Sequence, residues 1–149
     1  KHLLELFPDA KFIHIYRNPY KVYKSTWKLY NSILPLFSFQ HIDKNRFDKS
    51  ILKIYKGIYK KYLKEKNLIP KEDLIEIRFE KFIKNPIKTL EEIYSKFNLS
   101  GYDNAKPHFE KYIEKHKNYK TNQHKINKNI KDKIYKEWNF AFKEFGYKR

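Results

Sequence analysis

A short apolar run, Phe12 to Tyr16, which ends in an arginine and leads at once into a helix-start signal, most constrains the fold. The run favours β-structure and is apolar almost throughout, as expected of a strand buried in a parallel sheet. Asn18 is a good N-cap and Pro19 a good first helical residue, so a helix should begin there. Ligands of open α/β sheets bind beyond the carboxyl ends of strands. Arg17 stands at that place and is therefore a candidate anion ligand.

Ser25 adds a second polar group to the same place. It follows Asn18 by seven residues, about two helical turns, so both side chains lie on one face of the predicted helix. A hydroxyl there is able to donate to the anion that Arg17 would bind. Taken singly, Ser25 fits an ordinary helix-surface serine, and Arg17 fits an arginine paired with a carboxylate. The two together favour an anion site.

The rest of the chain has the pattern of helices around one further strand. Apolar residues recur at helical spacing in residues 46–66, 87–97 and 130–145, and Gly146 is a plausible residue after the last helix. In residues 46–66 the predicted buried stripe includes Ile54 and Ile58. Shorter helices are expected over 1–6 and 107–114, a strand over 74–79, and loops over 36–45 and 118–128, with Pro35 ending the helix that begins at Pro19.

These elements predict an α/β fold, a parallel sheet flanked by helices that is helix-rich in this segment. A chain of 149 residues is one domain's worth and is long enough for a hydrophobic core. Two strands are too few for such a sheet, and the chain has no Met. We therefore expect residues 1–149 to be the C-terminal portion of a single larger domain, with the other strands before Lys1.

The chain is strongly basic. Its formal net charge of +17, from 34 Lys and Arg against 17 Asp and Glu, would attract nucleotides, nucleic acid, acidic glycans or acidic lipid headgroups. Most of this charge is Lys, in a chain also rich in Asn, Ile and Tyr, which fits the codon bias of an AT-rich genome. The few arginines run against that bias. The arginines are therefore better candidates for anion ligands than the lysines, because bidentate phosphate recognition favours Arg.

Several kinds of site are excluded or disfavoured. The absence of Cys excludes disulfides, thiolate zinc sites and cysteine nucleophiles. The six His show no ligand spacing, so no metal site is expected, and His14 within the first strand is interpreted as a structural residue with a satisfied side chain. No Ser-His-Asp set follows from the spacing. No apolar run approaches the ~18 residues that a membrane helix needs.

The stretch FPDAKFIHIYRNPYKVYKS, residues 7–25, closely resembles the strand and helix that hold the 3′-phosphate of 3′-phosphoadenosine 5′-phosphosulfate (PAPS) in sulfotransferases. The usual family string is similar to FPDAKFIHLVRDPRDVVAS. This chain has Asn18 where Asp is common and Tyr20-Lys21 where Arg-Asp is common, and neither departure removes a phosphate ligand. The resemblance implies that Arg17 and Ser25 bind the 3′-phosphate.

Two further stretches extend the resemblance to most of the chain, from about Leu4 to Tyr147. Residues 73–86, DLIEIRFEKFIKNP, resemble the family's strand ending in Tyr-Glu-Asp-Leu, which implies that Phe79 lies by the adenine; core packing is the alternative. Lys120 and His124, with Lys117, fall where a basic loop closes over the 3′-phosphate in cytosolic relatives. The Arg-Lys-Gly form of that loop is absent here.

The resemblance implies a P-loop-kinase-like fold and an enzyme that moves a sulfuryl group from PAPS to a hydroxyl or amine. Catalysis would then consist of positioning and electrostatic stabilisation of an in-line displacement. In relatives the loop for the 5′-phosphosulfate and the catalytic base, His or Glu, lie in an N-terminal block with no counterpart in this sequence. We therefore assign no catalytic residue and expect the 149 residues alone to be inactive.

Other functions are left open. A basic nucleic-acid-binding module fits the charge and the 13 Tyr, although Tyr and Phe fall mostly at helical core spacing and no nucleic-acid signature is present. A nucleotide-dependent kinase relative or a degenerate binding scaffold would share the sheet. An acidic glycan is one possible acceptor. The aromatic residues 34–42 either cover the core, which we favour, or line an acceptor cleft. Composition and family favour a cytoplasmic bacterial protein.

Overall fold

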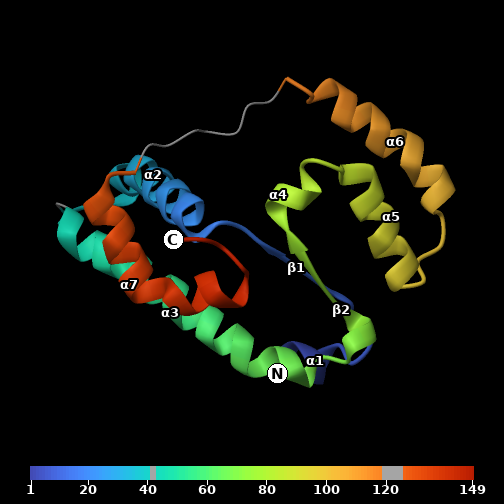
Figure 1. The fold of residues 1–149 in the computed structure, drawn as a ribbon, viewed down its shortest axis with the longest axis horizontal. Helices are drawn as coiled ribbons and strands as arrows, with labels where there is room; N and C mark the ends of the chain where they lie inside the picture. The colour runs from blue at the N-terminus through green and yellow to red at the C-terminus, as the bar shows by residue number, and fades with distance from the viewer. Residues whose placement is uncertain (41–42, 119–125) are drawn as a thin grey trace. The chain divides into compact units, whose positions relative to one another are not determined.

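The computed structural model describes residues 1–40, 43–118 and 126–149, which form two compact units (Figure 1). One unit contains Lys1–Tyr16 and the described part of Asn67–Gln123, and the other contains Arg17–Lys66 and the described part of His124–Arg149. Each unit has its own buried apolar side chains. The first unit carries the strands and the second is helical.

The described part of the first unit is built on a two-stranded parallel sheet, which confirms the predicted α/β class. The register sets Phe12 opposite Leu74 and Tyr16 opposite Arg78, so both carboxyl ends lie at one edge (Figure 1). The elements of this unit and its connections are α1 (His2–Leu6), β1 (Phe12–Tyr16), the 3₁₀ turns η1 (Lys66–Leu68) and η2 (Lys71–Asp73), β2 (Leu74–Arg78), α4 (Phe79–Phe82), α5 (Pro86–Lys96) and α6 (Tyr102–Lys115).

Helix α5 covers β2 and leaves one face of β1 half exposed. The buried cluster consists of Ile77, Ile93 and Phe97, from β2 and from the end of α5. Ile13 and Ile15 of β1 share the face of β2 that carries Ile77, because partners in a parallel register point to the same side. Each is nevertheless 49% exposed. The prediction of a buried first strand is therefore wrong for this face within the described residues.

Aromatic rings join α6 to α5. The ring of Tyr94 lies 5.3 Å from that of Tyr102 and 6.2 Å from that of Phe109, measured between centroids. The sequence predicts that this helix starts at Pro107, but α6 begins five residues earlier, at Tyr102. A proline inside a helix costs one backbone hydrogen bond. The aromatic contacts on both sides of Pro107 explain why the helix continues through it.

The second unit packs three helices against one another (Figure 1). Trp138 is fully buried in this unit. Its indole Nε1–H donates a 3.0 Å hydrogen bond to the backbone carbonyl of Leu52, and its ring stacks on that of Tyr55 at 3.8 Å. The backbone of Trp138 is non-helical and kinks its helix. The helices of this unit are α2 (Pro19–Phe37), α3 (Lys44–Glu65) and α7 (Lys128–Glu144).

A glycine ends the last helix, as the sequence predicts. Gly146 has a φ of 63°, in the left-handed region. The amide of Tyr147 donates to the carbonyl of Phe142 at 2.9 Å, and the amide of Gly146 to that of Lys143 at 3.4 Å. This pair of bonds is the Schellman motif, which satisfies carbonyls that a helix end would otherwise leave unpaired.

Three predictions about the second unit are wrong. Pro35 does not end α2, which runs two residues further to Phe37; Pro35 removes only one bond, close to the helix end. Ile54 and Ile58 of α3 are about 60% exposed rather than buried, because the buried face is centred on Ile51, Leu52 and Tyr55. The aromatic segment after Leu34 does not cover the core: Leu36, Phe37 and Phe39 are exposed.

Candidate anion-binding site

The N-terminus of α2 is capped by the chain itself. The side-chain oxygen of Asn18 accepts hydrogen bonds from the amides of Tyr20 (3.0 Å) and Lys21 (3.4 Å), and Pro19 has no amide hydrogen. Helix N-termini bind anions chiefly through such amides. Here those donors already have an acceptor. We therefore expect side chains to hold an anion at this place.

Arg17 and Ser25 flank this cap within the second unit. Arg17 is half-buried and directly follows β1, and Ser25 is exposed in the second turn of α2. Two helical turns separate Ser25 from Asn18, so the structure retains the shared face that the sequence predicts. The candidate pair is thus carried by one rigid helix and the residue before its cap.

The hydroxyl of Ser25 is available to a ligand. Ser32, seven residues further along the same face of α2, donates its hydroxyl hydrogen to the carbonyl of Lys28 at 3.0 Å. For Ser25, no hydrogen-bond partner occurs among residues 1–40, 43–118 and 126–149. A serine that bonds back to its own helix has its donor occupied. The hydroxyl hydrogen of Ser25 is therefore available to donate to an anion, whereas that of Ser32 is not.

Lys21 is a further cation at this site that sequence reasoning did not select. It precedes Ser25 by four residues, which places both side chains on one face of α2, and it is only partly exposed. The four-residue spacing between Lys21 and Ser25 is visible in the sequence. Lys is so abundant throughout the chain, however, that this spacing does not by itself single out Lys21.

Phe79 and Phe82 separate into two environments in the first unit. Phe82 packs against the buried cluster of Ile77, Ile93 and Phe97, whereas Phe79 is half-buried outside that cluster. Phe79 directly follows β2 and is the first residue of α4. The core-packing alternative thus holds for Phe82, while Phe79 keeps a partly exposed ring at the carboxyl end of its strand.

The predicted C-terminal basic loop is only partly covered by the structure. Lys120 and His124 lie outside the described residues. Lys117 is exposed and donates to the carboxylate of Glu114 on the same segment. His14, interpreted as structural, faces Glu76 across the two strands at 3.4 Å, which confirms a partnered histidine. No group of three metal-ligating side chains occurs within the described ranges.

The positive charge is concentrated in the second unit. The described residues of this unit carry 20 Lys and Arg against 6 Asp and Glu, a formal net charge of +14. The described residues of the first unit carry 12 against 11, a net charge of +1. Codon bias alone would spread Lys over both units without removing acids from one of them. The unit that holds Arg17 and Ser25 therefore has a field that attracts anions.

Burial raises the pKa values of Tyr20 and Tyr23, which lie on α2 between Arg17 and Ser25 and face the core. Burial raises the pKa values of Tyr55 and Tyr59 in the core of the second unit. The hydrogen bond and charge of Lys56 lower the pKa of the Glu137 carboxyl, with a 2.9 Å contact between Lys56 Nζ and the carboxylate. These shifts follow from packing and from one ion pair. They identify no catalytic acid or base.

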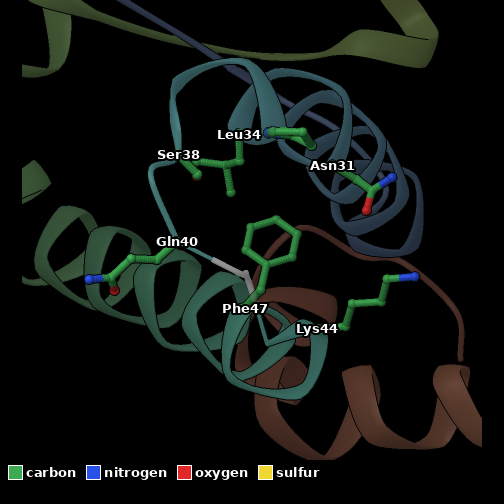
Figure 2. A pocket seen from close by; sticks show the side chains of 7 residues that line it. Asn31, Leu34, Ser38, Gln40, Lys44 and Phe47 are labelled. Atoms are coloured by element: carbon green, nitrogen blue, oxygen red, sulfur yellow. The ribbon is translucent and has the colours of Figure 1, made fainter.

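A pocket of about 310 Å³ lies between the end of α2 and the start of α3. Figure 2 shows the ring of Phe47 pointing into it toward Leu34, with Asn31 and Lys44 at its rim. Pro35 also lines it, so the walls are largely apolar. Pro35 has no amide hydrogen, so the helical bond that would end on the carbonyl of Asn31 cannot form. The pocket therefore combines apolar walls with polar groups on both sides of Phe47, from Ser38 and Gln40 on one side and from Asn31 and Lys44 on the other (Figure 2).

Comparison with known proteins gives one family. Residues 1–104 match the profile of the sulfotransferase family. Over all 149 residues the chain is 30% identical to the omega-hydroxy-beta-dihydromenaquinone-9 sulfotransferase Stf3 of Mycobacterium bovis, and equally to the protein of that name from Mycobacterium tuberculosis. The chain spans 38% of the length of each of these relatives. No solved structure matches significantly.

Proposed function

The chain belongs to the sulfotransferase family, and we propose that its protein moves a sulfuryl group from PAPS to a hydroxyl or amine acceptor. In this proposal residues 1–149 are the C-terminal part of one sulfotransferase domain and hold the 3′-phosphate end of the donor. One observation best supports it. Arg17 lies at the carboxyl end of β1, and two turns into the helix that follows, the hydroxyl of Ser25 has no partner among the described residues.

Each side chain has a distinct role in this proposal. The guanidinium of Arg17 donates two parallel hydrogen bonds to phosphate oxygens, Ser25 donates a third, and Lys21 adds a nearby positive charge. Side chains carry the recognition because the cap on Asn18 occupies the amides of the helix. Phe79 would lie by the adenine, and Lys120 and His124 would close over the 3′-phosphate; these three roles rest on the family resemblance.

Holding the 3′-phosphate orients the donor for transfer. The acceptor oxygen or nitrogen attacks sulfur, the bond from sulfur to the bridging phosphate oxygen breaks, and adenosine 3′,5′-bisphosphate leaves. The acceptor proton passes to a base that we do not assign to this chain. The described residues contribute by fixing one end of the donor, which lowers the entropic cost of reaching the reactive geometry.

For the acceptor we propose a hydroxyl carried on a largely apolar molecule. The names of the two mycobacterial relatives describe a hydroxylated menaquinone derivative as their substrate. The apolar walls of the pocket between α2 and α3 suit the apolar part of such a molecule. An acidic glycan, which the basic second unit would attract, is the competing acceptor class.

The full-length protein tests this function directly. Incubated with radiolabelled PAPS and a panel of hydroxylated quinones and acidic glycans, it should transfer label to an apolar hydroxyl acceptor. Arg17→Ala should raise the KM for PAPS, and Phe47→Ala should raise the KM for the acceptor. Transfer to glycans alone would overturn the acceptor class. Absence of transfer to any acceptor, together with stabilisation by ATP, would favour a kinase relative.

A further inference from the structure

Helix α2 carries an apolar stripe that the described residues of its unit leave largely exposed. Leu29, Ile33, Leu36 and Phe37 recur at helical spacing along one side of α2, and Phe39 follows just beyond its end. Leu36 and Phe37 are 78% and 75% exposed, and Phe39 is fully exposed. The opposite side of α2 already packs into the core through Tyr20 and Tyr23. The stripe is therefore a second apolar face, ending at a helix tip.

One positive side chain of α2 lies beside this stripe. Lys28 is exposed and precedes Leu36 by eight residues, about two helical turns. A further cation, Lys44, begins α3 at the rim of the pocket that Leu34 lines (Figure 2). The stripe belongs to the unit whose described residues carry a net charge of +14. Exposed Leu, Ile and Phe flanked by Lys, on a cationic body, are the composition of elements that lie in the interface of an anionic lipid bilayer.

A membrane surface fits this face better than a polynucleotide does. Lysines and aromatic rings suit both partners, since phosphates are common to both and rings can stack on bases. Leu29, Ile33 and Leu36 have no counterpart in a polynucleotide, whereas the acyl boundary of a bilayer takes them up. Among the described residues, no helix has the length and apolarity of a bilayer span.

We propose that the apolar stripe of α2, with Lys28 beside it, docks the protein onto anionic lipid surfaces. Phe37, Phe39 and Leu36 enter the headgroup–acyl boundary, while Lys28 contacts lipid phosphates. The proposal goes beyond sulfuryl transfer and does not depend on it. Docking would bring the second unit to the phase in which an apolar acceptor dissolves.

Vesicle co-sedimentation of the full-length protein tests the docking. We expect binding to vesicles of phosphatidylcholine with phosphatidylglycerol and weak binding to phosphatidylcholine alone. The triple variant Leu36→Ser, Phe37→Ser, Phe39→Ser should lose binding about tenfold or more. The variant Ile54→Ser, Ile58→Ser, which removes two apolar side chains about 60% exposed from α3 of the same unit, should bind as the wild type does.

Charge reversal provides an independent test of the docking. Lys28→Glu should weaken the preference for anionic vesicles, whereas Lys111→Glu on α6 should leave it unchanged. Equal vesicle binding by the stripe variant and the wild type would overturn the proposal. It would also be overturned if gel filtration showed self-association that the stripe variant abolishes, without vesicle binding, or if the protein bound single-stranded RNA but no vesicles. Circular dichroism of every variant confirms that the fold is intact.

Discussion

The carboxamide oxygen of Asn18 accepts a 3.0 Å hydrogen bond from the backbone amide of Tyr20. This bond starts α2 and occupies a donor that an anion would otherwise use. Asn18→Ala should lower the free energy of unfolding by about 1 kcal/mol, the usual cost of losing an N-cap. Urea unfolding measures this loss, and Asn18→Asp, which keeps the acceptor, is the matched control. Equal losses in both variants would show that the cap is not the cause.

Ser25 and Ser32 form a matched pair on one helix. Ser25→Ala should weaken binding of adenosine 3′,5′-bisphosphate to the full-length protein about tenfold or more, because a hydrogen bond to a charged group is lost. Ser32→Ala should leave binding unchanged, since its hydroxyl already bonds to the carbonyl of Lys28. Isothermal titration calorimetry measures both. Equal affinities for the wild type and Ser25→Ala would remove Ser25 from the site.

Trp138 is the main anchor of the second unit. It is fully buried, stacks on Tyr55 and donates to the Leu52 carbonyl. Trp138→Ala should cost about 3–5 kcal/mol of stability, from a large cavity and the lost hydrogen bond to the Leu52 carbonyl. The smaller change Trp138→Phe, which removes this hydrogen bond and part of the ring, should cost about 1–3 kcal/mol. The same change at the half-exposed Trp27 should cost much less. Thermal and urea unfolding test this order.

The ion pair of Lys56 and Glu137 predicts a dependence of stability on pH. Lys56 lowers the pKa of the Glu137 carboxyl below its usual value of 4.5. A carboxylate whose pKa is lower in the folded state stabilises the fold above its unfolded pKa, and this stabilisation is lost as the pH falls through the folded pKa. Glu137→Gln should therefore reduce stability slightly at neutral pH and not at low pH. The pair is partly exposed, so we expect an effect of about 0.5 kcal/mol or less.

The matched control for this pH effect is Glu110→Gln on α6, a carboxylate for which the structure describes no ion pair. Its unfolding curve should track that of the wild type across the whole pH range. A difference between Glu137→Gln and the wild type that persists unchanged at low pH would contradict an electrostatic origin.

Local signals in the sequence predicted most element boundaries. Asn18-Pro19 marks the start of α2, and Gly146 marks the end of α7, because capping is decided by a few neighbouring residues. Pro19 is the first residue of α2, as predicted, but the boundaries predicted at Pro35 and Pro107 are wrong. Both of these prolines lie inside helices, since packing elsewhere along those helices outweighs the loss of one hydrogen bond.

Burial was harder to predict than secondary structure. The apolar pattern of β1 does not reveal that α5 lies over β2, so the exposure of Ile13 and Ile15 was missed. At the candidate site, the spacing of Arg17 and Ser25 was readable from the sequence. The occupation of the helix amides by Asn18 and the different bonding of Ser25 and Ser32 were not, because they depend on side-chain conformation.

The central claim is that Arg17 binds the 3′-phosphate of an adenosine nucleotide. The most direct test is the thermal stability of the full-length protein with adenosine 3′,5′-bisphosphate, 5′-AMP or ATP, for the wild type and Arg17→Ala. At ~100-fold above Kd the bisphosphate should stabilise the wild type by about 2.7 kcal/mol. We predict that this stabilisation is selective for the bisphosphate and is lost in Arg17→Ala. Equal stabilisation by 5′-AMP, or full retention in Arg17→Ala, would contradict the claim.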